Sequence, residues 1–149
     1  MPTIEENAFI DRPPQEVFDY VAEPANLPVW DSSIVHAERL DNGPMAVGSR
    51  MKGTSKILGR RFDWTTEVVE FEPPRRSSMR SVDGDLIFTV TFTTEPEGSG
   101  TRITQRVDAD SGLGGVFGKI ADPLVQKAQA RTTRANLETL GEVLTEHGQ

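Results

Sequence analysis

The stretch that decides the fold reads Phe9-Ile10-Asp11-Arg12-Pro13-Pro14-Gln15-Glu16-Val17-Phe18-Asp19-Tyr20-Val21. A proline pair cannot continue a central strand, but it pre-sets the backbone for the first turn of a helix. Val17, Phe18 and Val21 share one face at helical spacing. We therefore expect a first strand over residues 3–10, followed by a short helix. A second helical segment, residues 25–30, is broken by a proline and ends at Trp30.

Strand-like segments fill the chain that follows, each bounded by turn residues. They are residues 32–40, 48–58, 60–71, 75–82, 85–94 and 101–110. The alternation is cleanest where Leu86, Phe88, Val90 and Phe92 share one face and threonines share the other. Asp83-Gly84 is a strong hairpin signal before that segment. The pattern predicts an antiparallel sheet with one face against the core and one face in water.

The chain closes with a helical segment that we expect to run from residue 122 to about residue 146. Asp122 followed by Pro123 is typical of a helix start. One apolar stripe consists of Leu124, Ala128 and Ala135, in line with Phe117 and Ile120. A second stripe, Leu137, Leu140 and Leu144, lies roughly 150° away at 100° per residue. Either the helix bends, or its first stripe packs under the glycine-rich residues 111–118, or that stripe makes a dimer contact.

This order of elements predicts an α+β fold in which a curved sheet wraps around the closing helix. A strand, two short helices, a meander of strands and a final helix would leave a hollow between the sheet and that helix. Hollows of this kind bind small molecules. The length of 149 residues indicates a single domain spanning residues 1–149.

Composition narrows the class of protein further. The chain has 16 Lys plus Arg against 23 Asp plus Glu, a net charge of −7, which disfavours binding to nucleic acid or to anionic membranes. It has no cysteine and two histidines, so we expect neither disulfides nor a metal site. We expect no membrane insertion, since no apolar run reaches ~20 residues. No secretory signal is recognisable at the N-terminus, so we expect a cytoplasmic protein.

The chain resembles the polyketide cyclase/dehydrase-like group of the START-related, helix-grip superfamily. The matching segments are residues 10–21 and 26–30, Val47-Gly48-Ser49-Arg50, residues 67–76, Gly100-Thr101-Arg102-Ile103-Thr104, and the leucines Leu137 and Leu140. The resemblance implies a seven-stranded antiparallel sheet gripping the C-terminal helix, with a cavity between them. It also implies binding of hydrophobic or aromatic molecules such as lipids, quinones or polyketides. Some members catalyse cyclisation and dehydration without a cofactor, so we expect no cofactor.

Inward-facing positions on the expected strands and helix give a candidate ligand-binding set. It consists of Gln105, Trp64, Met79, Phe88, Met51, Ser81, Gln129, Thr133 and Trp30. Gln105 stands out because it is polar on an otherwise apolar strand face, and a buried amide needs a partner. That partner is a ligand carbonyl, or else a buried water or the closing helix. Ser81 occupies a place that the family fills with larger apolar side chains, which would make the pocket roomier.

An enzyme of this kind needs a base and a hydrogen-bond donor together in a dry site. His36 is the only histidine in the body of the fold, and we expect it on the exposed face of its strand. Asp31 could supply a carboxylate, but we expect it to cap a turn. Three hypotheses remain. They are a binder of a hydrophobic small molecule, a cofactor-free polyketide cyclase or dehydratase, and an interaction module that forms a homodimer without a ligand.

Overall fold

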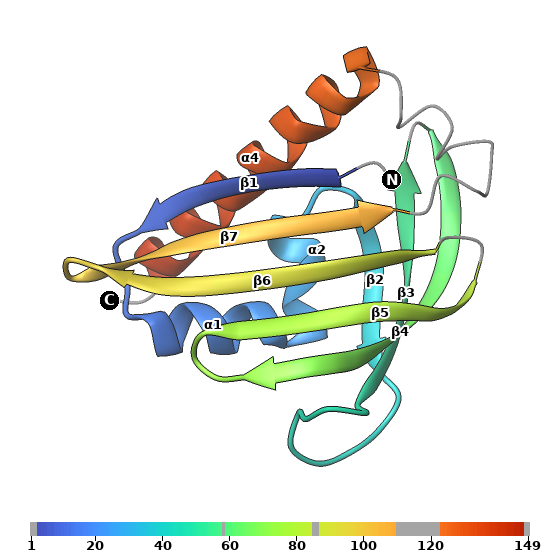
Figure 1. The fold of residues 1–149 in the computed structure, drawn as a ribbon, viewed down its shortest axis with the longest axis horizontal. Helices are drawn as coiled ribbons and strands as arrows, with labels where there is room; N and C mark the ends of the chain where they lie inside the picture. The colour runs from blue at the N-terminus through green and yellow to red at the C-terminus, as the bar shows by residue number, and fades with distance from the viewer. Residues whose placement is uncertain (1–2, 58, 85–86, 110–122, 148–149) are drawn as a thin grey trace.

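The computed structural model describes residues 3–57, 59–84, 87–109 and 123–147 (Figure 1). The elements are β1 (Thr3–Ile10), α1 (Pro14–Ala22), the 3-10 turn η1 (Pro24–Asn26), α2 (Leu27–Trp30), β2 (Ile34–Arg39), β3 (Arg50–Ile57), β4 (Arg60–Glu72), β5 (Arg76–Gly84), β6 (Phe88–Glu97), β7 (Gly100–Ala109) and α4 (Pro123–His147). All strands pair antiparallel in one 7-stranded sheet with the order β1-β7-β6-β5-β4-β3-β2. The sheet curls around the helices, which confirms the helix-grip α+β fold.

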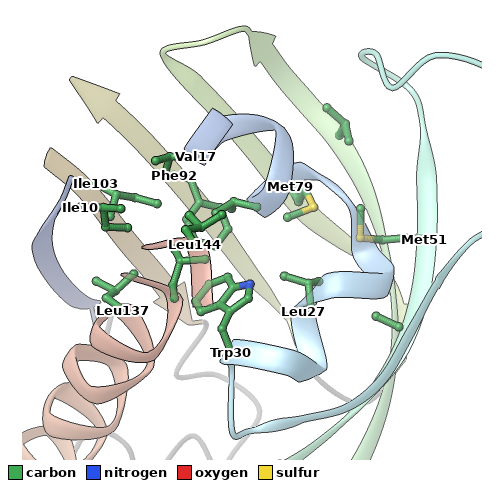
Figure 2. Close-up of a cluster of buried hydrophobic side chains, with 14 of the residues drawn as sticks. Ile10, Val17, Leu27, Trp30, Met51, Met79, Phe92, Ile103, Leu137 and Leu144 are labelled. Carbon is green, nitrogen blue, oxygen red and sulfur yellow. The ribbon is translucent and has the colours of Figure 1, made fainter. Parts of the chain in front are cut away.

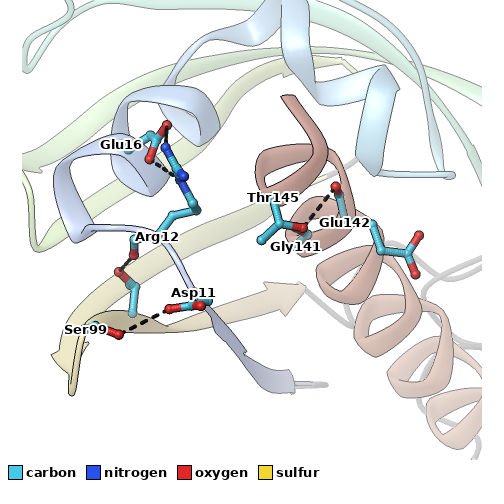
Figure 3. Close-up of polar contacts among 8 residues, drawn as sticks. Asp11, Arg12, Glu16, Ser99, Gly141, Glu142 and Thr145 are labelled. Atoms are coloured by element: carbon cyan, nitrogen blue, oxygen red, sulfur yellow. Dashed lines mark hydrogen bonds and ion pairs between the residues drawn. The ribbon is translucent and has the colours of Figure 1, made fainter. Parts of the chain in front are cut away.

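The proline pair ends β1 and starts α1, as its position in the sequence predicts. Pro14 is the first residue of α1, and Val17, Phe18 and Val21 are its buried face. The connection between β1 and α1 is tied to the start of β7, since the hydroxyl of Thr101 donates to the backbone oxygen of Arg12 at 2.7 Å. Arg12 in turn pairs with Glu16 at 2.6 Å (Figure 3). These bonds fix α1 against one end of the sheet.

Helix α4 packs on the concave face through its second apolar stripe. Leu137 and Leu140 are fully buried and Leu144 is 6% exposed. Figure 2 shows Leu137 and Leu144 in the same cluster of side chains as Ile10 and Ile103. An ion pair of 2.8 Å between Arg134 and Glu6 also joins α4 to β1. The C-terminal half of α4 is therefore the part that closes the core.

The first stripe of α4 does not pack on the sheet. Leu124 is 77% exposed, and Ala128 and Ala135 are exposed as well. Phe117 and Ile120, which we expected in line with this stripe, lie outside the described residues, as does the glycine-rich segment 111–118. Among the described side chains of the two stripes, only those of the second stripe are thus buried against the sheet.

Strand β6 is where the sequence-based boundaries are least accurate. We expected the strand to end at residue 94, but its pairing with β7 continues through Glu95 and Pro96 to Glu97. Pro96 costs no ladder hydrogen bond, because its nitrogen lies on the β5 side of β6, as that of Thr94 does, and the described pairing with β5 ends at Thr93. The turn follows at Gly98, whose φ of +58° suits glycine. The hairpin is consequently longer than the sequence pattern suggests.

Candidate functional site

A cavity of about 160 Å³ lies between the concave face of the sheet and the helices α2 and α4. It is lined by Ile4, Leu27, Asp31, Ser33, Ile34, Met51, Ser55, Trp64, Thr66, Met79, Phe88, Val90, Phe92, Gln105, Val107, Ala109, Gln129, Thr132, Thr133 and Asn136. For scale, an apolar cavity of about 150 Å³ can hold one benzene molecule. The space therefore suits one ring or a short branched chain.

Most of the candidate ligand-binding residues lie on the wall of this cavity. Those that line it are Met51, Trp64, Met79, Phe88, Gln105, Gln129 and Thr133. They come from five strands and from α4, so residues that are far apart in the sequence are brought to one hollow. Their role in binding a ligand stays a prediction.

Ser81 and Trp30 are the candidates that the structure does not place on the cavity wall. The Ser81 hydroxyl accepts a hydrogen bond of 2.9 Å from the backbone N–H of Phe88, beyond the last pair of the β5–β6 ladder. Trp30 is 2% exposed and packs edge-on against Phe92, with 5.9 Å between ring centroids. Ser81 therefore links two strands, and Trp30 belongs to the core beside the cavity (Figure 2).

Trp64 and Phe88 form an aromatic corner of the cavity. Their rings meet edge to face at 6.3 Å and 90°. The indole N–H of Trp64 donates to the hydroxyl of Ser55 on the neighbouring strand at 2.8 Å, so this buried polar atom is satisfied. Gly53 leaves the space that the indole ring occupies across the β3–β4 pair. The position of Trp64 is thus set by packing as well as by a hydrogen bond.

Asp31 is the main polar residue of the cavity wall. From the sequence we expect it to cap a turn. It does cap a turn, since its Oδ1 accepts from the backbone N–H of Ser33 at 2.9 Å and from the Ser33 hydroxyl at 2.7 Å. The same oxygen also accepts from the amide of Asn136 on α4 at 3.1 Å. Burial raises the pKa of Asp31, and the hydrogen bonds from Ser33 oppose that rise.

Asn136 is itself held in one orientation. Its side-chain oxygen accepts from the backbone N–H and from the hydroxyl of Ser32, at 3.2 and 3.0 Å. The amide nitrogen is thereby directed to Asp31. The sequence signal for this cluster was incomplete because Asp31 and Asn136 are 105 residues apart. Only the local pattern Asp31-Ser32-Ser33 was visible.

Two further polar atoms at the cavity have no partner among the described residues. They are Oε1 of Gln105 and the hydroxyl of Thr66. Gln105 is 7% exposed, and its Oε1 does not bond to the described part of α4, which was one of the alternatives for this residue. A buried acceptor without a donor costs about 1–3 kcal/mol. A group entering the cavity could supply that donor.

The charges around the cavity are few. Asp31 is the one ionisable side chain among the described residues that line it, and no lysine, arginine or histidine is among them. His36 lies on the surface with 57% of its side chain exposed, as expected, 3.8 Å from Glu38. The described residues contain no group of three His, Cys, Asp or Glu that could hold a metal ion. No described helix has the length and hydropathy to cross a membrane.

The sequence matches the family described as polyketide cyclase/dehydrase and lipid transport over residues 1–145. The chain belongs to this family. An uncharacterized protein of Mycobacterium tuberculosis strain H37Rv is 27% identical over 143 residues, which cover 93% of this chain and 92% of that protein. The cyclase/dehydrase resemblance seen in the sequence is confirmed.

Solved structures support the same fold. A crystal structure of a protein from Thermus thermophilus superposes with a TM-score of 0.79 at 23% identity, covering 98% of this chain and 99% of that chain. The di-domain ARO/CYC BexL from the BE-7585A biosynthetic pathway gives a TM-score of 0.67 at 21% identity, with 97% of this chain and 48% of that chain covered. At these identities the two structures show that the chain shares their fold.

Proposed function

We propose that this protein binds a largely hydrophobic small molecule of lipid, polyketide or aromatic type in the cavity between the sheet and α4. The observation that carries the proposal is the hollow of about 160 Å³ whose walls are mainly aliphatic and aromatic side chains. Transfer of apolar surface from water into such a space is favourable by about 25 cal/mol per Å². A cavity that is left unfilled also forgoes packing contacts, which an apolar occupant would restore.

Titration with p-xylene tests this proposal, because p-xylene is apolar and close in size to the cavity. Nuclear magnetic resonance reports on three cavity groups at once, namely the methyl groups of Met51 and Met79 and the indole N–H of Trp64. We expect saturable shifts at all three sites. Shifts that stay linear with p-xylene concentration, or that are absent, would contradict ligand binding in this cavity.

A matched pair of variants on α4 separates cavity binding from surface binding. Thr133→Phe places a ring in the cavity, and we expect it to abolish the saturable shifts. Arg131→Phe places the same ring on the exposed side of α4 and should leave the affinity for p-xylene unchanged. Equal affinity of both variants for p-xylene would argue against the cavity as the site.

The cyclase or dehydratase hypothesis is the second candidate, and Asp31 is the observation that favours it. Removal of a proton next to a carbonyl needs a base in a site that excludes water. The buried carboxylate of Asp31 could serve as that base. Incubation with a linear poly-β-ketone, followed by mass spectrometry for the loss of water, tests this activity. No loss of water above the uncatalysed rate would reject the hypothesis for that substrate.

The remaining sequence-based expectations stay predictions. The hypothesis of a homodimer without a ligand does not account for the cavity, so we favour ligand binding over the interaction module. We propose the cytoplasm as the location, since a net charge of −7 and the lack of cysteine both fit that compartment.

A further inference from the structure

Among the described residues, Asp31 has partners for one carboxylate oxygen and none for the other. Oδ1 accepts three hydrogen bonds, two from Ser33 and one from Asn136. Oδ2 accepts none from the part of the chain that the structure describes. The residue as a whole is 7% exposed, and it lines the cavity. A carboxylate has room for about four hydrogen bonds in total, so Oδ2 has unused capacity.

The part of the chain that the structure describes also places no cation beside Asp31. No ion pair joins it to a lysine, arginine or histidine among the described residues. A buried carboxylate without a cation is costly unless hydrogen bonds replace its hydration. Its neighbours satisfy only one half of the group. The other half is available to whatever enters the cavity.

We propose that Asp31 is the polar anchor of the cavity, with Oδ2 accepting a hydrogen bond from a hydroxyl or amine group of an otherwise apolar ligand. The proposal rests on the proposed function and adds the chemical class of the ligand. When Asp31 is ionised, this hydrogen bond has a charged acceptor and is stronger than one between neutral groups. The anchor thus fixes which end of the ligand points toward α2 and Asn136.

The Asp31 carboxylate disfavours hydrophobic ligands that carry an anionic head group. A fatty acid or a phospholipid carries an anionic head, which would need a lysine or arginine in the cavity. The described lining has neither, and it places Asp31 there instead. Gln105 and Thr66 can turn toward either a donor or an acceptor, so they do not select between these classes. A phenol, an alcohol or a neutral amine on an apolar body therefore fits best.

The isosteric probes p-cresol and p-xylene test the anchor, because a hydroxyl in one replaces a methyl group in the other. Dissociation constants are measured for both probes with the unmodified protein and with Asp31→Asn. We expect Asp31→Asn to weaken p-cresol binding by about 10-fold or more relative to its effect on p-xylene. Asp63→Asn is the matched control, since Asp63 is exposed on β4 beside Trp64. It should leave the ratio of the two constants unchanged.

Each outcome of this experiment decides a different point. If Asp31→Asn weakens both probes equally, or neither, the anchor is wrong while the proposed function stands. If 4-methylbenzoate binds the unmodified protein better than p-cresol, the anchor is also wrong, because an anion would then be preferred beside Asp31. If no probe binds the unmodified protein, the proposed function fails and the anchor fails with it.

A measurement on the unmodified protein covers the case in which Asp31→Asn does not fold. The carbon-13 resonance of the Asp31 carboxyl group reports directly on hydrogen bonding to its oxygens. We expect it to move on saturation with p-cresol and to stay in place with p-xylene. Equal movement with both probes would overturn the proposal.

Discussion

The glycine at position 53 makes a strong test of how the aromatic wall of the cavity is built. A Cβ atom at Gly53 would lie 2.5 and 2.6 Å from two ring carbons of Trp64, and it would also meet the backbone oxygen of His36. Contacts this short do not occur between real atoms, so the variant Gly53→Ala must displace a ring or a strand. The ring of Trp64 faces the cavity, and β2 pairs with β3 at His36.

The cost can be worked out from these contacts. Overpacking a well-packed site costs about 1–3 kcal/mol. If the indole moves away, the bond from Trp64 to Ser55 is lost as well, which adds about 1 kcal/mol. We therefore expect Gly53→Ala to lower the free energy of unfolding by about 2–4 kcal/mol. Urea unfolding followed by tryptophan fluorescence measures this change.

Gly141→Ala is the matched control, because it adds the same methyl group where there is room. The new Cβ would lie 3.5 Å from a side-chain carbon of Ile10, an ordinary contact. Alanine is favoured over glycine inside a helix, so Gly141→Ala should stabilise the fold by about 0.5–1 kcal/mol. Gly53→Ala with unchanged stability and an unmoved Trp64 indole resonance would refute the packing argument.

Three further predictions concern the cavity and the helix that closes it. Burial raises the pKa of Asp31 above 3.8, so the folded chain keeps the carboxyl proton to a higher pH than the unfolded chain does. The stability that this proton contributes is therefore lost as the pH rises from the unfolded pKa through the folded pKa. Asp31→Asn should consequently gain stability relative to the unmodified protein as the pH rises above about 4 in urea unfolding, and a constant difference would contradict this. Gln105→Leu removes an acceptor without a partner, so the free energy of unfolding should stay the same or rise by about 1 kcal/mol, and a clear loss would reveal a missed partner. Leu140→Ala should lower the free energy of unfolding by about 2–5 kcal/mol, because Leu140 is fully buried. Glu142→Ala, on the exposed side of α4, should change it by less than about 0.5 kcal/mol. Similar losses in the two variants would argue against the packing of α4 on the sheet through its leucines.

The sequence predicted the architecture well because the signals for it are local. Alternation assigned the faces of the strands, and the Pro13-Pro14 pair marked the change from strand to helix. The helical periodicity also predicted two apolar stripes on α4, and the buried one, Leu137, Leu140 and Leu144, is one of them. Such patterns depend on neighbours a few residues apart, and a single sequence contains them.

The cavity wall was harder to predict where the ladder is irregular. Alternation placed Ser81 on the wall, but β4 and β5 shift register between Thr65 and Thr66 and again between Val68 and Glu70. Beyond Arg80 the described pairing of β5 with β6 also ends, while its pairing with β4 continues. The Ser81 hydroxyl then replaces a ladder bond on the β6 side by accepting from the backbone N–H of Phe88. Neither the shifts nor the end of pairing has a signal in this sequence.

The partnership of Asp31 with Asn136 links the binding site to the closure of the fold. Among the described residues, three hydrogen bonds join α4 to Asp31 and Ser32 at the end of α2, and all three are made by Asn136. One of the three bonds to the carboxylate, the bond from Asn136, therefore also joins the middle of α4 to the cavity wall. A ligand that donates to Oδ2 would lower the cost of keeping this charge buried, and so it would stabilise the folded protein. Consider two ligands that bind the Asp31→Asn variant with equal affinity, one with a hydrogen-bond donor and one fully apolar. We expect the ligand with the donor to raise the free energy of unfolding of the unmodified protein more than the apolar ligand does.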